Sequence, residues 1–343
     1  MSMYGVYEPE CAPAGGDYGM PRVVIPAPQD ERHAHLAWPK IVKGPDGNLV
    51  AAFLAAREHT VGGCPATALS RDDGSSFTAP RVLKQFDATE DYHHSGNVAL
   101  GVAGDGAIVL LAMAMVGDER NTIFGWRSTD SGVTWEPTDT GTLGNNATGS
   151  VYGSVFRVPG RGLAVCGHYR QPRGRGIWIA FSRDDGRSWG PPRTISDERR
   201  YGEPAFVCTK GRLIGLVRES PQPHYHQFVS EDSGRTWLRP RVVMEGPNAT
   251  HPSPFLAVDP REPQRLYALQ SQRTERGEVF LWEADAGELN WRRRGLVVTF
   301  KGCEDYSYPW MVHLSGDEWL MVFYAGSRRG ENHIWGMRLR TAD

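Results

Sequence analysis

The sequence predicts an all-β protein with the architecture of a six-bladed β-propeller. Two repeats lead to this fold class: a short polar motif occurs five times at a nearly constant spacing, and a strand–turn–strand pattern occurs six times around it. Glycine and proline account for 40 and 24 of the 343 residues, as many short strands and tight turns require. Repeats of about 40 to 50 residues that are filled with strands are typical of propeller blades.

The polar motif has the pattern Ser-x-Asp-x-Gly-x-x-aromatic. Four complete copies occupy residues 70–77, 128–135, 182–189 and 230–237, and a worn copy with one extra residue occupies 283–291. The copies therefore start about 48 to 58 residues apart. The aspartate can accept backbone N–H bonds, the glycine permits a positive φ, and the aromatic ring can pack between sheets. The motif predicts a structural turn far from any chemistry.

The second repeat consists of two apolar runs joined by a tight turn. Its six copies cover residues 38–53, 96–114, 153–168, 203–218, 253–269 and 308–324, and their turns carry residues typical of hairpins. Six hairpins predict six blades. Only one strand follows the last hairpin, so we expect a strand near 21–27 to complete that blade and close the ring. On this prediction residues 1–343 form a single domain.

Composition excludes several classes of protein. The net charge of −2 gives no basic field for nucleic acid, and no run of about 18 apolar residues could span a membrane. The N-terminus has neither the basic start nor the apolar core of a secretory signal. Five scattered cysteines without CxxC spacing favour reduced thiols. We therefore expect a cytoplasmic protein, or a secreted one whose signal has been removed.

One mouth of the central channel is the expected functional site. In each blade the first strand begins at this mouth and the second strand returns to it, so the residues that flank the hairpins line it. These flanks are rich in histidine, arginine, acidic and tyrosine residues, whereas the opposite mouth is made of turns. Polar groups gathered in a concave mouth are the default hypothesis for a site.

We expect neither a metal ion nor another cofactor. Histidines cluster at 33–35, 93–94 and 224–226, but none of these groups has the spacing of a known zinc motif. No Asp-rich calcium loop is present either.

From about residue 20 the chain resembles the sialidase superfamily of six-bladed propellers, whose Asp-box the polar motif resembles. Residues 202–220 are similar to the sialidase segment in which a glutamate opens a strand and an arginine ends the hairpin. The resemblance implies that Glu203 polarises a tyrosine and that Arg218 binds a substrate carboxylate. Residues 305–310 resemble the segment that carries the tyrosine nucleophile, for which Tyr306 is preferred and Tyr308 is the alternative.

The chain also departs from that family. The arginine motif of blade one is replaced by Ala37, Trp38 and Pro39, and residues 59–67 contain no acid where sialidases carry the acid/base aspartate. His59 or Glu58 could take that role. Blade five shows no clear third arginine. These departures predict that the chain is not an ordinary sialidase.

The favoured function is that of a glycoside hydrolase that cleaves a bond near an acidic sugar. Hydrolysis could use the tyrosine or two carboxylates such as Glu203 with Glu58 or Glu304. A second hypothesis is a polysaccharide lyase in which His93 or His168 removes a proton from a uronate and a tyrosine protonates the leaving oxygen. A third is a glycan-binding propeller without catalysis, since one fold hosts many functions.

The expected partner is an oligosaccharide or polysaccharide, acidic under the hydrolase and lyase hypotheses. The residues expected to contact it are Arg218, Arg170, Arg57, His94, Trp38 and His251. The catalytic candidates are Glu203, Tyr306, Tyr308, His93 and His168.

Overall fold

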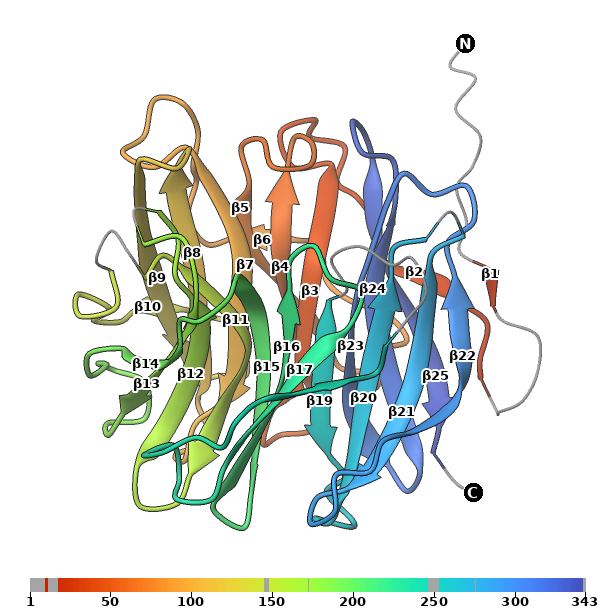
Figure 1. Cartoon of the computed structure of the whole chain (residues 1–343). Coiled ribbons are helices and arrows are strands. Elements are labelled where there is room, and N and C mark those ends of the chain that lie inside the picture. The colour runs from red at the N-terminus through yellow and green to blue at the C-terminus, as the bar shows by residue number, and fades with distance from the viewer. Residues whose placement is uncertain are drawn as a thin grey trace.

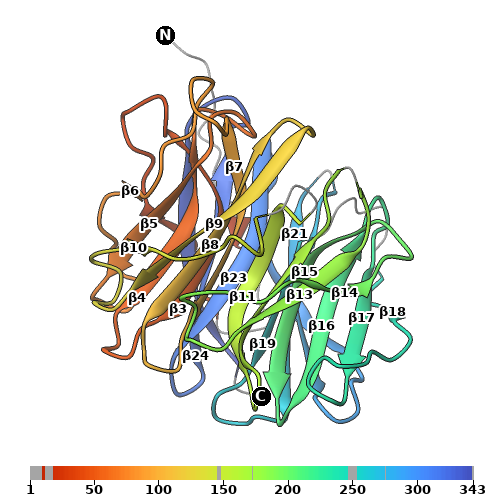
Figure 2. The ribbon, with the colours of Figure 1, turned by 90° about the vertical axis from the view of Figure 1, so that its left-hand side faces the viewer.

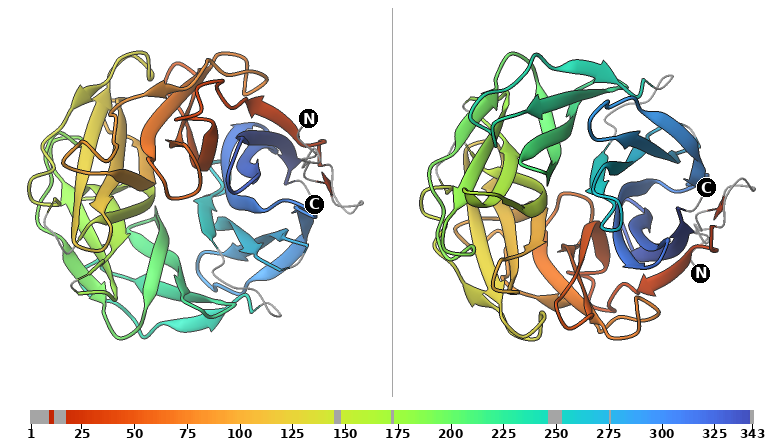
Figure 3. Two further views of the ribbon diagram at one scale, coloured as in Figure 1. Left: turned by 90° about the horizontal axis from the view of Figure 1, so that it is seen from above. Right: turned by 90° about the horizontal axis from the view of Figure 1, so that it is seen from below.

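The computed structural model describes residues 10–11, 18–144, 148–171, 173–245, 253–274 and 276–341. Every regular element in these ranges is a β-strand. The strands form six antiparallel blades of four strands, with a short fifth strand at the edge of blade five, and the blades are arranged in a ring around a central axis (Figures 1 and 3). Short parallel pairings of β7 with β11 and of β25 with β3 join neighbouring blades. The prediction of an all-β, six-bladed propeller is confirmed. No helix in the described ranges is long and apolar enough to cross a bilayer.

The first three blades follow one another along the chain. Blade one contains β3 (His35–Lys43), β4 (Leu49–Ala56), β5 (Cys64–Ser70) and β6 (Arg81–Val82). Blade two contains β7 (His94–Val102), β8 (Ile108–Val116), β9 (Arg120–Ser128) and β10 (Glu136–Pro137). Blade three contains β11 (Ser150–Val158), β12 (Gly162–His168), β13 (Ile177–Ser182) and β14 (Arg193–Ser196). In each blade the first strand lies innermost.

The last three blades repeat this order. Blade four contains β15 (Tyr201–Thr209), β16 (Arg212–Glu219), β17 (Tyr225–Ser230) and β18 (Arg241–Val243). Blade five contains β19 (Pro254–Val258), β20 (Arg265–Gln272), β21 (Glu278–Asp285) and β22 (Arg292–Thr299), and β1 (Glu10–Cys11) pairs with β22 at its edge. Blade six contains β23 (Asp305–Ser315), β24 (Glu318–Gly326), β25 (Asn332–Arg340) and β2 (Arg22–Ile25).

The two ends of the chain meet in blade six. Strand β2 pairs antiparallel with β25, with Arg22 opposite Gly336 and Val23 opposite Trp335. A strand from the start of the chain therefore completes the sheet built by its end. This pairing covers the outer edge of β25, which would otherwise present unpaired backbone groups.

The core lies between the blades, which pack face to face (Figure 2). All eight residues of β4 are buried, because both faces of that strand contact neighbouring layers. Such strands are apolar on both sides, which explains the continuous apolar runs of the hairpins. The sheets thus form a rigid ring that holds the strand ends at the mouth.

The repeated polar motif lies between the third and fourth strands of its blade, as the fourth copy shows. The N–H of Gly234 donates to Ser230 Oγ (2.8 Å), and the N–H of Thr236 donates to Asp232 Oδ1 (2.8 Å). These backbone and side-chain bonds hold the pKa of Asp232 well below its usual range. Ser233 and Gly234 have φ values of 60° and 79°. The prediction of a structural turn is confirmed.

Candidate functional site

Five of the six inner strands bulge at one height, close to the mouth. On each of them, extra residues oppose a single residue of the second strand. The bulges begin at Trp38, Gly96, Gly153, Glu203 and Tyr308. Bulges of this kind re-aim side chains and are frequent beside active sites.

Three of these bulges carry a strained backbone. Trp38, Glu203 and Tyr308 have φ values of 56°, 51° and 50°, and each precedes a proline. A positive φ in a residue with a side chain costs about 1 to 3 kcal/mol and persists only where the surrounding structure enforces it. The three side chains are buried. Strain at three equivalent positions marks the mouth as the candidate site.

Glu203 is the centre of this site. Its Oε1 accepts hydrogen bonds from the phenol of Tyr308 (2.5 Å) and the amide of Asn97 (3.2 Å), and lies 3.0 Å from Nη2 of Arg218. Burial favours the neutral acid, but Arg218 and these hydrogen bonds outweigh it and lower the pKa of Glu203. The residue is therefore a carboxylate at neutral pH.

Tyr308 remains a phenol. Burial raises the pKa of its hydroxyl, and the charge of Glu203 raises it further. The O–H therefore donates to Glu203, which is placed to accept the proton if Tyr308 attacks an electrophile. This pair has the geometry of a nucleophile and its base.

Three cations surround Tyr308. The guanidinium of Arg273 lies 5.4 Å from the Tyr308 ring centre, and its Nη2 is buried without a hydrogen-bond partner. Arg218 lies next to Glu203 Oε1, the oxygen that accepts the Tyr308 hydroxyl. Lys40 is fully buried, with Nζ 4.5 Å from the ring centre of Tyr152, and burial lowers its pKa to about 7. Arg218 pairs with Glu203, whereas Nη2 of Arg273 is a buried donor without a hydrogen-bond partner, so the centre of the mouth suits an anionic group.

The side chain of His168 contacts the backbone of Glu203. Its Nδ1 accepts the N–H of Glu203 (3.3 Å), so the proton of the neutral ring lies on Nε2. Burial lowers the pKa of His168 to about 4, which keeps the ring neutral at pH 7. The histidine supports Glu203 and can donate a hydrogen bond from Nε2.

A second cluster adjoins Trp38. Asp305 Oδ2 lies 2.6 Å from Nδ1 of His59 and 3.0 Å from Nε2 of His35, and Asp305 Oδ1 accepts the hydroxyl of Tyr324 (2.8 Å). The Trp38 ring contacts both His59, with ring centres 5.5 Å apart, and Tyr308, at 5.9 Å. Burial alone would raise the pKa of Asp305, but the two histidines hold it well below its usual range.

The structure brings together Glu203, Arg218, Tyr308, His168 and Trp38 among the residues expected from the sequence. It does not bring Tyr306 to them, so the preference for Tyr306 over Tyr308 was wrong in its geometry. The Tyr306 hydroxyl donates to the Thr274 carbonyl (3.0 Å), and its ring stacks on Phe300. The cause is the bulge at Tyr308, which breaks the simple alternation of side chains along β23.

The other expected contacts lie toward the rim. His93 is exposed, and His94 is buried with Nδ1 accepting the N–H of Gly63 (2.8 Å). Both line a hollow of about 460 Å³ together with the exposed Arg57. Arg170 pairs with Asp118 at 3.0 Å. His251 lies outside the described residues.

A local sequence feature marks two groups of the mouth, Tyr308, which was the alternative to Tyr306, and Lys40, which was not expected there. In three bulges the residue that turns into the mouth precedes a proline, and Tyr308 shares this feature whereas Tyr306 does not. Lys40 directly follows the proline of blade one. Arg273 is not next to a proline. It directly follows Gln272, the last residue of β20. Blade five thus brings an arginine close to Tyr308, where the sequence showed no clear one.

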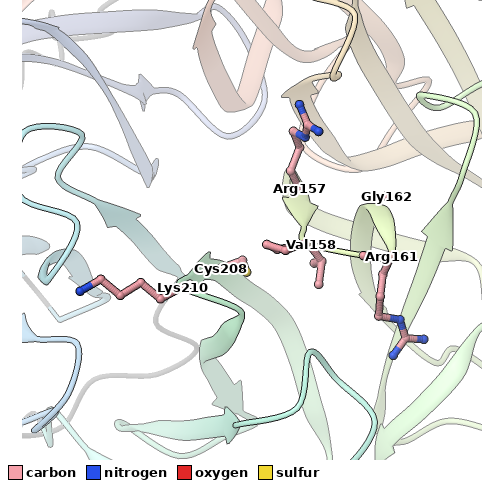
Figure 4. A pocket seen from close by; sticks show the side chains of 8 residues that line it. Arg157, Val158, Arg161, Gly162, Cys208 and Lys210 are labelled. Carbon is pink, nitrogen blue, oxygen red and sulfur yellow. The ribbon is translucent and has the colours of Figure 1, made fainter.

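The opposite mouth is less suited to a ligand. A hollow of about 410 Å³ lies there between the β11–β12 and β15–β16 turns. Figure 4 shows that the charged ends of Arg157, Arg161 and Lys210 point away from one another rather than into a common space. Arg161 donates to the Ser233 carbonyl (3.0 Å) and covers the Phe181 ring.

The sequence matches one known family. The family described as BNR repeat-like domain matches residues 83–318, which is more than half of the chain. No curated protein matches the sequence closely enough to count as a relative.

Solved structures share the fold. A protein of unknown function from Dyadobacter fermentans has a TM-score of 0.75 at 19% identity, over 95% of this chain and 98% of that one. The Hadza microbial sialidase Hz136 has a TM-score of 0.72 at 17% identity, over 94% and 68%. The Trypanosoma rangeli sialidase also has a TM-score of 0.72 at 17% identity, over 97% and 60%. At such identities the likeness concerns the fold alone.

Proposed function

Because the chain belongs to the BNR repeat-like family of sialidase-type propellers, we propose that it acts on glycans, as a glycoside hydrolase that cleaves the bond of a carboxylated sugar. One observation carries the proposal: the Tyr308 phenol donates to the Glu203 carboxylate between two arginines. A tyrosine with an adjacent base is a recognised form of activated nucleophile.

In the proposed reaction Tyr308 attacks the anomeric carbon while Glu203 takes the phenol proton. The glycosidic C–O bond breaks, and water later hydrolyses the glycosyl-tyrosine that forms. A neutral phenol suits this step, because it carries no charge to repel Glu203 before substrate binds. Residues 59–67 offer no carboxylic acid to protonate the leaving group. We therefore expect aryl glycosides, whose leaving groups need little protonation, to react faster than alkyl glycosides.

The carboxylate preference rests on the cations of the mouth. Arg218 and Arg273 supply guanidinium groups, which pair with carboxylates through charge-assisted hydrogen bonds. Ala37 supplies none, so the set of three arginines expected of a sialidase is incomplete. We therefore expect other carboxylated sugars to be better substrates than sialic acid.

The lyase hypothesis has less support from this geometry. His168 has its lone pair occupied by the N–H of Glu203 and so presents a donor rather than a base. His93 is exposed on the rim and lines a different hollow from the one around Tyr308.

The test is a panel of aryl glycosides of ulosonic and uronic acids with neutral sugars as controls, read by release of the aryl group. Absorbance of unsaturated uronate is recorded in parallel on acidic polysaccharides. A matching fluorinated glycosyl fluoride should trap a covalent adduct, which peptide mass spectrometry should locate on Tyr308. Unsaturated products without hydrolysis would replace the hydrolase by a lyase. Binding without turnover of any substrate would leave a glycan-binding propeller.

A further inference from the structure

Two histidines and an aspartate from blades one and six converge beside the mouth. His35 opens β3, His59 follows β4 and Asp305 opens β23. Their nitrogen and oxygen atoms lie within 4.8 Å of one another. We propose that His35, His59 and Asp305 bind a divalent first-row transition-metal ion. No local sequence motif indicates this site, because His59 and Asp305 are 246 positions apart in the chain.

The hydrogen bonding of His35 fixes which nitrogen is available. Nδ1 of this buried ring lies 3.2 Å from the carbonyl oxygen of Gly330, which can only accept, so Nδ1 carries a proton. In the neutral ring Nε2 then holds a lone pair. That lone pair is 3.0 Å from Asp305 Oδ2, which is also an acceptor. Two acceptors so close require a cation or an added proton between them.

The alignment of the contact favours an ion over a proton. Nε2 of His35 makes no hydrogen bond, although Oδ2 of Asp305 is near enough for one. The ring nitrogen therefore points to one side of that oxygen. Ligands of a shared ion adopt this arrangement, because each lone pair points at the ion and not at the other ligand.

The spacing of the ligand atoms also fits one ion. Oδ2 of Asp305 is 2.6 Å from His59 Nδ1 and 3.0 Å from His35 Nε2. An ion about 2.1 Å from each of these atoms would make angles of roughly 75° and 90° with the two aspartate–histidine pairs. These are angles between neighbouring positions in six-coordinate or distorted lower-coordinate geometry. The two histidine nitrogens lie within 4.8 Å of each other.

Outer contacts hold the three ligands in place. The Gly330 carbonyl fixes the tautomer of His35, and the Tyr324 hydroxyl donates to Asp305 Oδ1 at 2.8 Å, which leaves Oδ2 for an ion. The Trp38 ring packs edge-on against His59. Backbone carbonyls on ligand histidines and donors on ligand carboxylates are the usual supports of protein metal sites.

The ligand set points to the class of ion. Two imidazoles with one carboxylate suit Zn²⁺, Fe²⁺, Co²⁺ or Ni²⁺, whereas Mg²⁺ and Ca²⁺ prefer oxygen ligands alone. Three protein ligands leave at least one position open, as in catalytic sites. The His59 side chain is 16% exposed, so solvent or a ligand has a route to the cluster. The proposal does not rest on the proposed hydrolase activity, because binding is measured without substrate.

The test uses the whole protein after removal of metals with a chelator and dialysis. Co²⁺ is added while visible absorption is recorded, and Zn²⁺ is titrated in a calorimeter. We expect one ion per chain. His35→Gln and His59→Gln should each abolish stoichiometric Co²⁺ binding, and Tyr324→Phe, which keeps all three ligands, should weaken it about tenfold to a hundredfold.

His226→Gln is the matched control. His226 belongs to a second group of three such residues, Glu219, His224 and His226, at the rim of blade four. If this variant alone loses Co²⁺ binding, the ion binds there and the proposal fails. It also fails if the wild type binds no stoichiometric Co²⁺, or if both glutamine variants bind it normally.

If a variant does not fold, wild-type crystals soaked in Zn²⁺ test whether the ion binds at this site. Anomalous scattering at the zinc edge should show a peak between His35, His59 and Asp305. A peak elsewhere, or none, would mean that Asp305 and its histidines share only protons.

Discussion

The phenol oxygen of Tyr308 lies 2.5 Å from Oε1 of Glu203, although the two residues are 105 positions apart and belong to blades four and six. Each opens a bulge of its inner strand with a left-handed backbone, and each precedes a proline. The contact therefore depends on two matched distortions of the sheet.

Replacing the phenol of Tyr308 tests the nucleophile. Tyr308→Phe should lower kcat on the best aryl glycoside at least about a hundredfold, because Glu203 then has no attacking group to deprotonate. Tyr306→Phe is the matched control, since it loses only the bond to the Thr274 carbonyl, and it should retain most of kcat. Steady-state kinetics on both variants measures the difference. Equal losses would remove Tyr308 from the reaction.

Removing the Arg273 charge tests the preference for an acidic ligand. Arg273→Met should weaken binding of a carboxylated sugar about tenfold to a hundredfold and leave a neutral sugar nearly unchanged, since a charge-assisted contact contributes about 1.5 to 3 kcal/mol. Arg239→Met, at an exposed arginine beside the fourth polar motif, is the control. Calorimetric titration gives both affinities. Parallel losses for the two sugars would show that Arg273 does not contact the carboxylate.

Lys40 should make stability depend on pH in the alkaline range. Burial lowers its pKa to about 7 in the folded chain from 10.5. Between these values the unfolded chain binds more protons, so the unfolding free energy of the wild type rises with pH, by on the order of 1.4 kcal/mol per pH unit. Lys40→Met lacks this slope and should exceed the wild type in stability most clearly below pH 7.

Urea denaturation of both proteins between pH 6 and 10 measures this effect. Lys210→Met, at an exposed lysine, is the control and should follow the wild type. A gap between Lys40→Met and the wild type that stays constant with pH would mean that Lys40 keeps its proton throughout.

The first polar motif offers a test of its structural role. Asp72 binds the N–H and hydroxyl of Ser76, and these bonds lower its pKa to about 2. Asp72→Ala should lower Tm by roughly 2 to 4 °C at pH 7, a modest loss because the site is solvent-screened. A carboxylate with a lowered pKa stabilises the fold above about pH 4 and loses this effect as pH falls toward 2. The variant and the wild type should therefore converge in acid.

Calorimetric melting between pH 2.5 and 7 gives both Tm values. Asp91→Ala, at an exposed aspartate outside the motif, serves as the control and should melt like the wild type. An Asp72→Ala deficit that persists at the acid end would assign the loss to something other than the carboxylate.

The fold was predictable because its signals are local. Hairpins and polar turns are encoded within about 20 residues, and their spacing counts the blades. Glu203 and Arg218 were predictable for the same reason, since they mark the ends of one hairpin. Tyr308 was assigned second place because strand alternation cannot indicate where a bulge changes the facing side. The His35–His59–Asp305 cluster could not be predicted from the sequence, because its three segments are far apart in the chain and meet only in the closed ring.

The bulges of the inner strands separate the residues that line the mouth from the residues that pair within the sheets. Three of the bulged blades each place one buried side chain at the mouth, from a point where the strand ladder is already interrupted. None of Trp38, Glu203 and Tyr308 is paired across the strand, so the register of the ladder does not depend on which side chain stands there. The residues that line the mouth are therefore set apart from the residues whose pairing holds each sheet together.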